Sequence, residues 1–321
     1  YMMPSDHIYT APKEWWLPYT DPSFMCSAYD NMHASWSSTH EETWDVVKHN
    51  DFVGGQFIWT GFDYIGEPTP YAYPARSSYF GIIDLAGLPK DSYYMYQSEW
   101  TSKDVLHLFP HWNWLPGQVI DMWCYYNHAD EVELFVNGKS QGVRRKTVYG
   151  AKNEGKAFEK STEYHVMWRV NFEPGEVKVV ARKNGKQVGE QIIRTAGAPH
   201  HLVLKKTYQG YQAFGASEPT TFVEVNVVDK EGNLCPNAEN QIFFSVIGEK
   251  AGEEAGEEAS AGLDEKAGLK ILGTDNGCQT SLERFTDPHR KAFFGKCIVV
   301  LKGKGTLKAQ AIDLKDATLS L

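Results

Sequence analysis

Polar and apolar residues alternate along several short segments in the middle of the chain. The clearest are Val119–Tyr126, Glu131–Val136, Tyr164–Val170 and Glu176–Ala181. Because successive side chains of a β-strand point to opposite faces, a period of two predicts strands with one buried face. The dipeptides Asn137-Gly138 and Asn184-Gly185 favour the tight turns of β-hairpins. We therefore predict an immunoglobulin-like β-sandwich over residues 108–197.

A second region of alternation follows a linker at residues 196–199. Residues 201–205 and 221–228 alternate in the same way, so we predict a second immunoglobulin-like sandwich over 198–321. Near 248–268 the alternation is interrupted by near-repeats of Ala-Gly-Glu-Glu, whose apolar content is too low to pack in a core. We expect an acidic loop there.

Residues 1–107 differ from the rest of the chain, since nine of the ten tryptophans lie at or before Trp123. Thr39 and Glu42 have the spacing of a helix capping box, in which each side chain bonds the other residue's backbone N–H. This spacing predicts a helix over about 41–49.

The apolar run Val53–Trp59 lacks polar alternation, which is typical of a strand covered on both faces in a parallel sheet. A proline-rich loop over 66–74 follows it, and a further helix is expected over 92–100. A helix followed by a buried strand indicates an α/β region. In a β/α barrel, loops that leave the carboxyl ends of strands build the active site.

Length and charge exclude several classes of protein. The 321 residues suit two or three domains, and a net charge of −9 with a pI near 5.7 leaves no basic surface for nucleic acid. No apolar run approaches the roughly 20 residues that cross a bilayer, so no membrane span is expected. The tyrosine-rich start lacks an initiator Met and a signal-peptide pattern, as a fragment would.

The five cysteines are widely spaced and form no C-x-x-C pair for zinc or redox chemistry. Buried free thiols are expected, while a bridge between Cys278 and Cys297 stays open. His33 and His40 lack a known ligand spacing, and no phosphate-binding glycine loop follows a strand. We expect no metal and no cofactor.

Two stretches, Phe57–Tyr71 and Ala75–Asp91, resemble the end of the catalytic barrel in glycoside hydrolase family 2, especially the bacterial β-galactosidases. The resemblance continues more weakly into the two predicted sandwiches. It implies that residues 1–107 are the carboxyl-terminal end of a (β/α)8 barrel. It also favours a periplasmic or secreted bacterial parent enzyme, meaning the longer protein to which such a region belongs.

In that family the eighth barrel strand ends in a Trp that forms the floor of the sugar site, and the matching residue is Trp59. The indole suits this role physically, because the axial hydrogens of a sugar make an apolar face that packs on an aromatic ring. Asp63, Glu67 and Arg76 lie on or near the same loop and are candidates to bond sugar hydroxyls. Turn capping or loop pinning are the alternatives for these three residues.

A retaining glycosidase needs two carboxylates about 5 Å apart. In the family these glutamates end the fourth and seventh strands, and both matching positions would lie upstream of Tyr1. Glu41 and Glu42 fit a helix amino terminus instead. The resemblance therefore implies a chain without a catalytic residue, which is inactive alone.

The family members that cleave glucuronides carry an Asn-x-Lys element that 76–81 lacks, so a β-galactoside or other neutral oligosaccharide is the expected substrate. The alternative function is a non-catalytic carbohydrate-binding or scaffold module. Assembly of a partial barrel with another chain stays open. Separately, an outer sugar subsite or, more simply, packing in the core and loops is expected for the aromatic cluster of Trp15, Trp16, Tyr19 and Tyr29.

Overall fold

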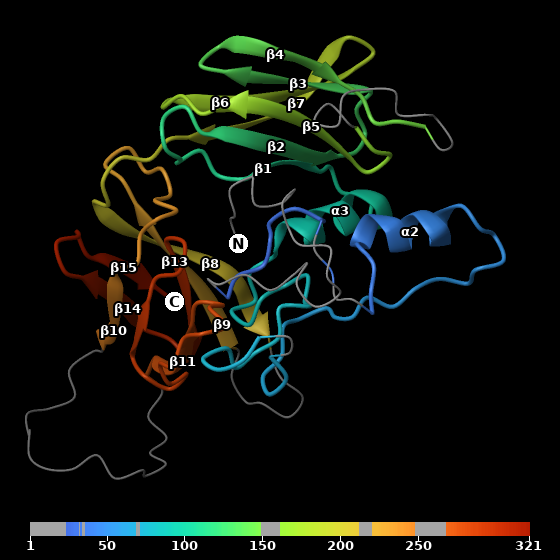
Figure 1. Cartoon of the computed structure of the whole chain (residues 1–321). Coiled ribbons are helices and arrows are strands. Elements are labelled where there is room, and N and C mark those ends of the chain that lie inside the picture. The colour runs from blue at the N-terminus through green and yellow to red at the C-terminus, as the bar shows by residue number, and fades with distance from the viewer. Residues whose placement is uncertain are drawn as a thin grey trace, which may run out of the picture. The chain divides into compact units, whose positions relative to one another are not determined.

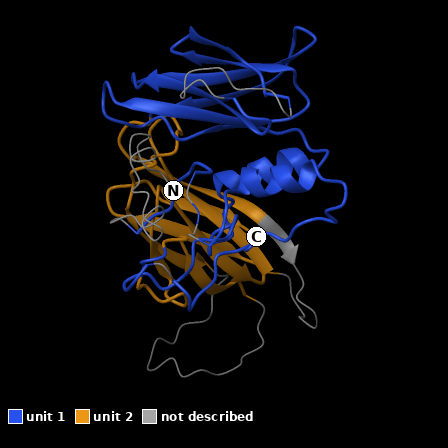
Figure 2. Ribbon diagram, turned by 45° about the vertical axis from the view of Figure 1, so that its right-hand side comes forward, with its two compact units in different colours: residues 1–195, 279–281 blue, residues 196–278, 282–321 orange. Residues whose placement is uncertain are grey.

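The computed structural model describes residues 24–31, 33, 36–68, 71–148, 161–211, 220–247 and 268–321. The chain divides into two compact units (Figure 2). Unit 1 comprises Tyr1–Thr195 with Gln279–Ser281, and unit 2 comprises Ala196–Cys278 with Leu282–Leu321. Almost all regular structure in the described residues is antiparallel β-sheet.

Two helices lie in the described part of unit 1, α2 (His40–Lys48) and α3 (Asp91–Trp100). The predicted capping box is present, since the Thr39 side chain accepts from the Glu42 N–H and the Glu42 carboxylate accepts from the Thr39 N–H. Both helices match their predicted ranges within one residue. The local capping signal was thus sufficient to locate the start of α2.

The predicted buried strand Val53–Trp59 is wrong for this chain. Residues 53–59 belong to no β-ladder among the described residues, and Phe57 is fully exposed. Backbone pairing begins only at Thr60, whose N–H donates to Phe80 (3.1 Å) and whose carbonyl accepts from Ile82 (3.1 Å). A strand of a closed barrel has a neighbour on each side, and the described residues supply none to 53–59. A barrel end is therefore not evident in the structure.

The first pair of sheets lies in unit 1 (Figure 1). The three-stranded sheet has the order β1 (Leu106–Phe109), β2 (Val119–Tyr126), β5 (His165–Asn171). The four-stranded sheet has the order β4 (Lys139–Arg144), β3 (Glu131–Val136), β6 (Glu176–Lys183), β7 (Lys186–Arg194). Asn137-Gly138 and Asn184-Gly185 turn these hairpins with positive φ at all four residues, as predicted.

The two sheets of unit 1 bury their facing side chains in one core, with Trp168 and Leu134 almost fully enclosed. The other face of the three-stranded sheet is covered as well. There Trp123 and Tyr125 pack with Met95 of α3 and with Tyr29. Covering on both faces explains why β2 is buried along nearly its whole length.

Unit 2 contains two further antiparallel sheets. One has the order β11 (Lys270–Asp275), β13 (Lys296–Lys302), β9 (Thr220–Val228), β8 (His201–Tyr211). The other has the order β12 (His289–Lys291), β10 (Gln241–Ile247), β14 (Thr306–Ala311), β15 (Ala317–Ser320). Val223, Val225 and Phe244 contribute to their shared core. The acidic loop expected near 248–268 lies outside the described residues, apart from Gly268.

All five cysteines are free thiols, so the bridge between Cys278 and Cys297 is not formed. Four of the five are buried, and burial raises the pKa of the Cys235 thiol to about 11. No helix in the described part of the chain combines the length and the apolar character required to cross a membrane.

Candidate functional site

Trp59 lies at the surface of unit 1, with 74% of its area exposed. A cis peptide bond joins it to Thr60. Its indole N–H donates to the Tyr64 hydroxyl (3.2 Å), and the two rings meet edge to face at 77° with centroids 6.0 Å apart. The edge of the indole is therefore held by the protein while most of its surface faces solvent.

Glu67 lies close to the same group. Its carboxylate oxygen Oε2 is 3.5 Å from the Tyr64 hydroxyl, and the residue is exposed. Tyr64 thus links Trp59 to Glu67, which places an aromatic surface beside an accessible carboxylate. Sequence reasoning missed Tyr64, because nothing in a loop sequence indicates that its hydroxyl returns to a ring five positions earlier.

Asp63 is placed differently from Glu67, although the two residues are neighbours in sequence. Its buried carboxylate accepts from the Gly81 N–H (2.8 Å) and lies 2.9 Å from the Lys90 ammonium. Burial raises the pKa of Asp63, although Lys90 opposes this change. The polar partners of this carboxylate lie inside the protein, so it anchors the loop to residues 81–90.

Arg76 uses its backbone to hold the same loop. Its carbonyl accepts from the Gly66 N–H, and its own N–H donates to the Gln279 carbonyl, both at 3.0 Å. Next to it, the Ser78 hydroxyl accepts from the Tyr64 N–H (3.1 Å). Residues 76–78 therefore hold the Trp59 loop in place through hydrogen bonds.

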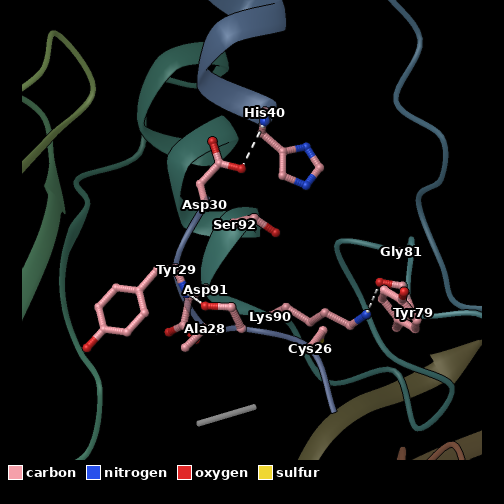
Figure 3. A pocket seen from close by; sticks show the side chains of 11 residues that line it. Cys26, Ala28, Tyr29, Asp30, His40, Tyr79, Gly81, Lys90, Asp91 and Ser92 are labelled. Carbon is pink, nitrogen blue, oxygen red and sulfur yellow. Dashed lines mark hydrogen bonds between the residues drawn. The ribbon is translucent and has the colours of Figure 1, made fainter. Parts of the chain in front are cut away.

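A small cavity lies next to residues 76–78, between the amino termini of α2 and α3 (Figure 3). Asp30, His40, Tyr79 and Lys90 are among its lining residues. Its volume of about 70 Å³ is far below the roughly 300–1,000 Å³ of ordinary ligand pockets. It has room for water molecules but not for a sugar ring.

The polar groups of this cavity already have structural partners. The Asp30 carboxylate accepts from the backbone N–H groups of His40 (2.9 Å) and Glu41 (2.7 Å) at the start of α2. Burial raises the pKa of Asp30 in spite of these bonds and the nearby His40. The Lys90 ammonium also donates to the Tyr79 carbonyl (2.9 Å). The cavity lining thus fixes the two helix starts.

The acidic residues at the start of α2 are structural too. Glu42 completes the capping box, and Glu41 reaches the sandwich, where its carboxylate lies 2.5 Å from His165 Nδ1 and accepts from the Thr162 hydroxyl (2.9 Å). Tyr29 packs in the core and donates to the Asp121 carbonyl (2.6 Å). Trp15, Trp16 and Tyr19 lie outside the described residues.

Residues 117–189 match a domain family of unknown function, DUF4982. The chain is 52% identical to "Beta-galactosidase BoGH2A" from Bacteroides ovatus, over all of this chain and 34% of that protein. It is 28% identical to a "Beta-glucuronidase" from Formosa agariphila over 170 residues, 52% of this chain and 16% of that protein.

A solved β-glycosidase from Bacteroides vulgatus has a TM-score of 0.73 and 33% identity, over 94% of this chain and 34% of that one. The chain thus spans about a third of the length of the first relatives that it matches. By sequence it corresponds to the carboxyl-terminal region of the glycoside hydrolases of family 2.

Proposed function

We propose that this chain is the end of the catalytic (β/α)8 barrel and two immunoglobulin-like sandwiches of a retaining family 2 enzyme that hydrolyses β-galactosides. The main support is the exposed Trp59, whose indole is held at one edge by Tyr64 beside Glu67. An aromatic face next to a polar group is the arrangement that stacks a sugar and bonds its hydroxyls.

The packing of residues 56–59 supports a barrel end. Gln56 donates to the Tyr96 hydroxyl of α3 (3.3 Å), and Ile58 packs against the cluster that contains Met95. Phe57 and Trp59, on the opposite side, are exposed. A barrel strand has helices on one face and the barrel interior on the other, so this segment has the one-sided covering expected of a barrel strand whose interior neighbours are not among the described residues.

Several further large apolar side chains on and near this segment are exposed. Phe52, Phe57, Phe62 and Ile65 each expose more than half of their surface, as Trp59 does. Soluble proteins rarely leave such a group of large apolar side chains uncovered. We therefore assign these side chains to packing against the upstream part of the parent enzyme. The Bacteroides ovatus relative is about three times as long as this chain.

No catalytic residue is assigned to this chain. The two carboxylates of a retaining glycosidase would be upstream. Asp30 and Glu42 bond the start of α2, and Asp63 pairs with the buried Lys90. Glu41 bonds His165, and Glu67 is exposed beside Tyr64. Trp59 and Glu67 are proposed to contact the sugar. Asp63 and Arg76 are proposed to position their loop.

The experiment compares variants of a longer polypeptide that includes the upstream glutamates. Trp59→Ala should lower kcat/KM for a chromogenic β-galactoside at least tenfold, about 1.4 kcal/mol or more. Trp36→Ala is the matched control, because Trp36 is also highly exposed but lies outside the loop. It should leave kcat/KM unchanged.

A near-normal kcat/KM for Trp59→Ala would contradict the sugar-floor assignment. A chromogenic β-glucuronide in parallel tests the substrate class, and faster cleavage of it would contradict the galactoside assignment. If the isolated chain bound oligosaccharides and Trp59→Ala left that binding unchanged, a binding module would replace the enzyme proposal.

A further inference from the structure

Three possible metal ligands from two segments of unit 1 lie close together. Asp45 and His49 are one turn apart, at and just beyond the end of α2, and Glu163 precedes β5. One ligand atom from each residue lies within 4.8 Å of the other two. His49 Nε2 is 2.9 Å from Glu163 Oε2 and 3.8 Å from Asp45 Oδ1.

These separations fit a tetrahedral ion. Zinc bonds to nitrogen and oxygen ligands are about 2.0–2.1 Å long, which at tetrahedral angles separates neighbouring ligand atoms by roughly 3.3 Å. The two measured separations lie on either side of that value. The Asp45 and Glu163 ligand atoms lie within 4.8 Å of each other, so the side chains must move closer together before all three atoms contact one ion.

Neighbouring side chains contact the three proposed ligands, and the site is open to solvent on one side. The Tyr164 hydroxyl donates to Asp45 Oδ1 (2.8 Å), and the Lys48 ammonium lies 2.6 Å from Glu163 Oε1, leaving Oε2 directed at His49. A hydrogen bond such as that from Tyr164 fixes the orientation of a metal ligand. The side chains of His49 and Glu163 are 17% and 18% exposed, and that of Asp45 is 44% exposed. An ion can therefore enter past Asp45.

We propose that Asp45, His49 and Glu163 bind a Zn²⁺ ion, with water as the fourth ligand. One imidazole and two carboxylates suit zinc better than magnesium or calcium, which prefer all-oxygen sets with more ligands. The ion would join the end of α2 to the segment that enters β5. This proposal does not depend on the glycosidase assignment.

Lys48 opposes the ion, because its positive charge is held within bonding distance of Glu163. Glu99 also retains this ammonium at 2.8 Å. Removing the charge should therefore strengthen zinc binding. This expected gain in zinc affinity distinguishes the zinc proposal from a purely structural ion-pair network. In such a network Lys48→Gln would only loosen the contacts.

The test is a titration of the purified chain with Zn²⁺ against a competing chelator dye, in wild type and in His49→Gln, Glu163→Gln and Lys48→Gln variants. His128→Gln is the matched control, since His128 Nδ1 lies 2.8 Å from Asp104 but belongs to no three-ligand group among the described residues. All variants keep the five thiols, so differences from wild type do not report cysteine binding. Circular dichroism checks that each variant is folded.

We expect His49→Gln and Glu163→Gln to weaken one zinc equivalent about tenfold or more, as loss of a ligand does. His128→Gln should match wild type, and Lys48→Gln should bind more tightly. Equal stoichiometry and affinity in all five proteins would overturn the proposal, as would weaker binding by Lys48→Gln. If His49→Gln does not fold, Asp45→Asn replaces it with the same expected loss.

Discussion

Two segments of this chain that were both predicted to be strands differ in burial. Residues 223–228 of β9 are largely buried, with Val225 fully enclosed, whereas residues 53–59 leave Phe57 fully exposed. Strand β9 is bonded to β8 on one side and β13 on the other. Residues 53–59 lie in no ladder among the described residues. An apolar run becomes a buried strand where neighbouring strands bond its backbone, and the described residues supply such neighbours to β9 but not to residues 53–59.

The core of unit 2 provides the largest expected effect. Phe244→Ala removes a buried ring from the core of β10 and leaves a cavity, so it should lower the free energy of unfolding by about 3–5 kcal/mol. Urea unfolding followed by circular dichroism measures the change. A loss below about 1 kcal/mol would show that this core is loosely packed.

A smaller effect is expected at the turn after β9. The Asp229 carboxylate accepts from the N–H groups of Gly197 (2.9 Å), Glu231 (3.0 Å) and Asn233 (2.8 Å) and from the Asn233 side chain (2.9 Å). Burial opposes its ionisation, but these bonds prevail and lower its pKa. Asp229→Asn should cost about 1–3 kcal/mol at pH 7.

The pH dependence of this cost has a definite sign. A lowered pKa gives stability that is present above the unfolded-state pKa of about 3.9 and is lost as the pH falls through the lower folded-state pKa. The difference between wild type and Asp229→Asn should therefore shrink below about pH 4. A constant difference between pH 7 and pH 3 would show that ionisation of Asp229 contributes nothing.

The smallest effect is expected where the apolar segment is exposed. Phe57→Ala makes the same chemical change as Phe244→Ala, but the ring is already in solvent. Its free energy of unfolding should stay within about 0.5 kcal/mol of wild type. A loss of 2 kcal/mol or more would mean that Phe57 packs against other residues of this chain, and the comparison would fail.

Features that depend on neighbouring residues could be predicted from the sequence. The capping box of Thr39 and Glu42 located α2, and Asn137-Gly138 located the hairpin between β3 and β4. Each depends on contacts within a few positions. The strand over 53–59 could not be judged in the same way, because its partners are distant in sequence.

The candidate site illustrates the same limit. Asp63 and Glu67 were equal candidates in the loop sequence, yet one pairs with Lys90, 27 positions away, and the other stays exposed beside Tyr64. Only the path of the chain through residues 76–90 separates them. Trp59 was predicted to end a buried strand and to form the floor of a sugar site. The structure leaves its side chain exposed, and its role towards a sugar stays a prediction.

The central proposal is that residues 53–59, which form no strand among the described residues, become a barrel strand when the upstream part of the parent enzyme is present. Hydrogen exchange of their backbone amides tests it, in the isolated chain and in a longer polypeptide with the upstream residues. We predict rapid exchange in the isolated chain and strong protection in the longer polypeptide, because strand neighbours then accept these N–H groups. The amides of β9 serve as the control and should be protected equally in both. Equally rapid exchange of residues 53–59 in both polypeptides would contradict the claim.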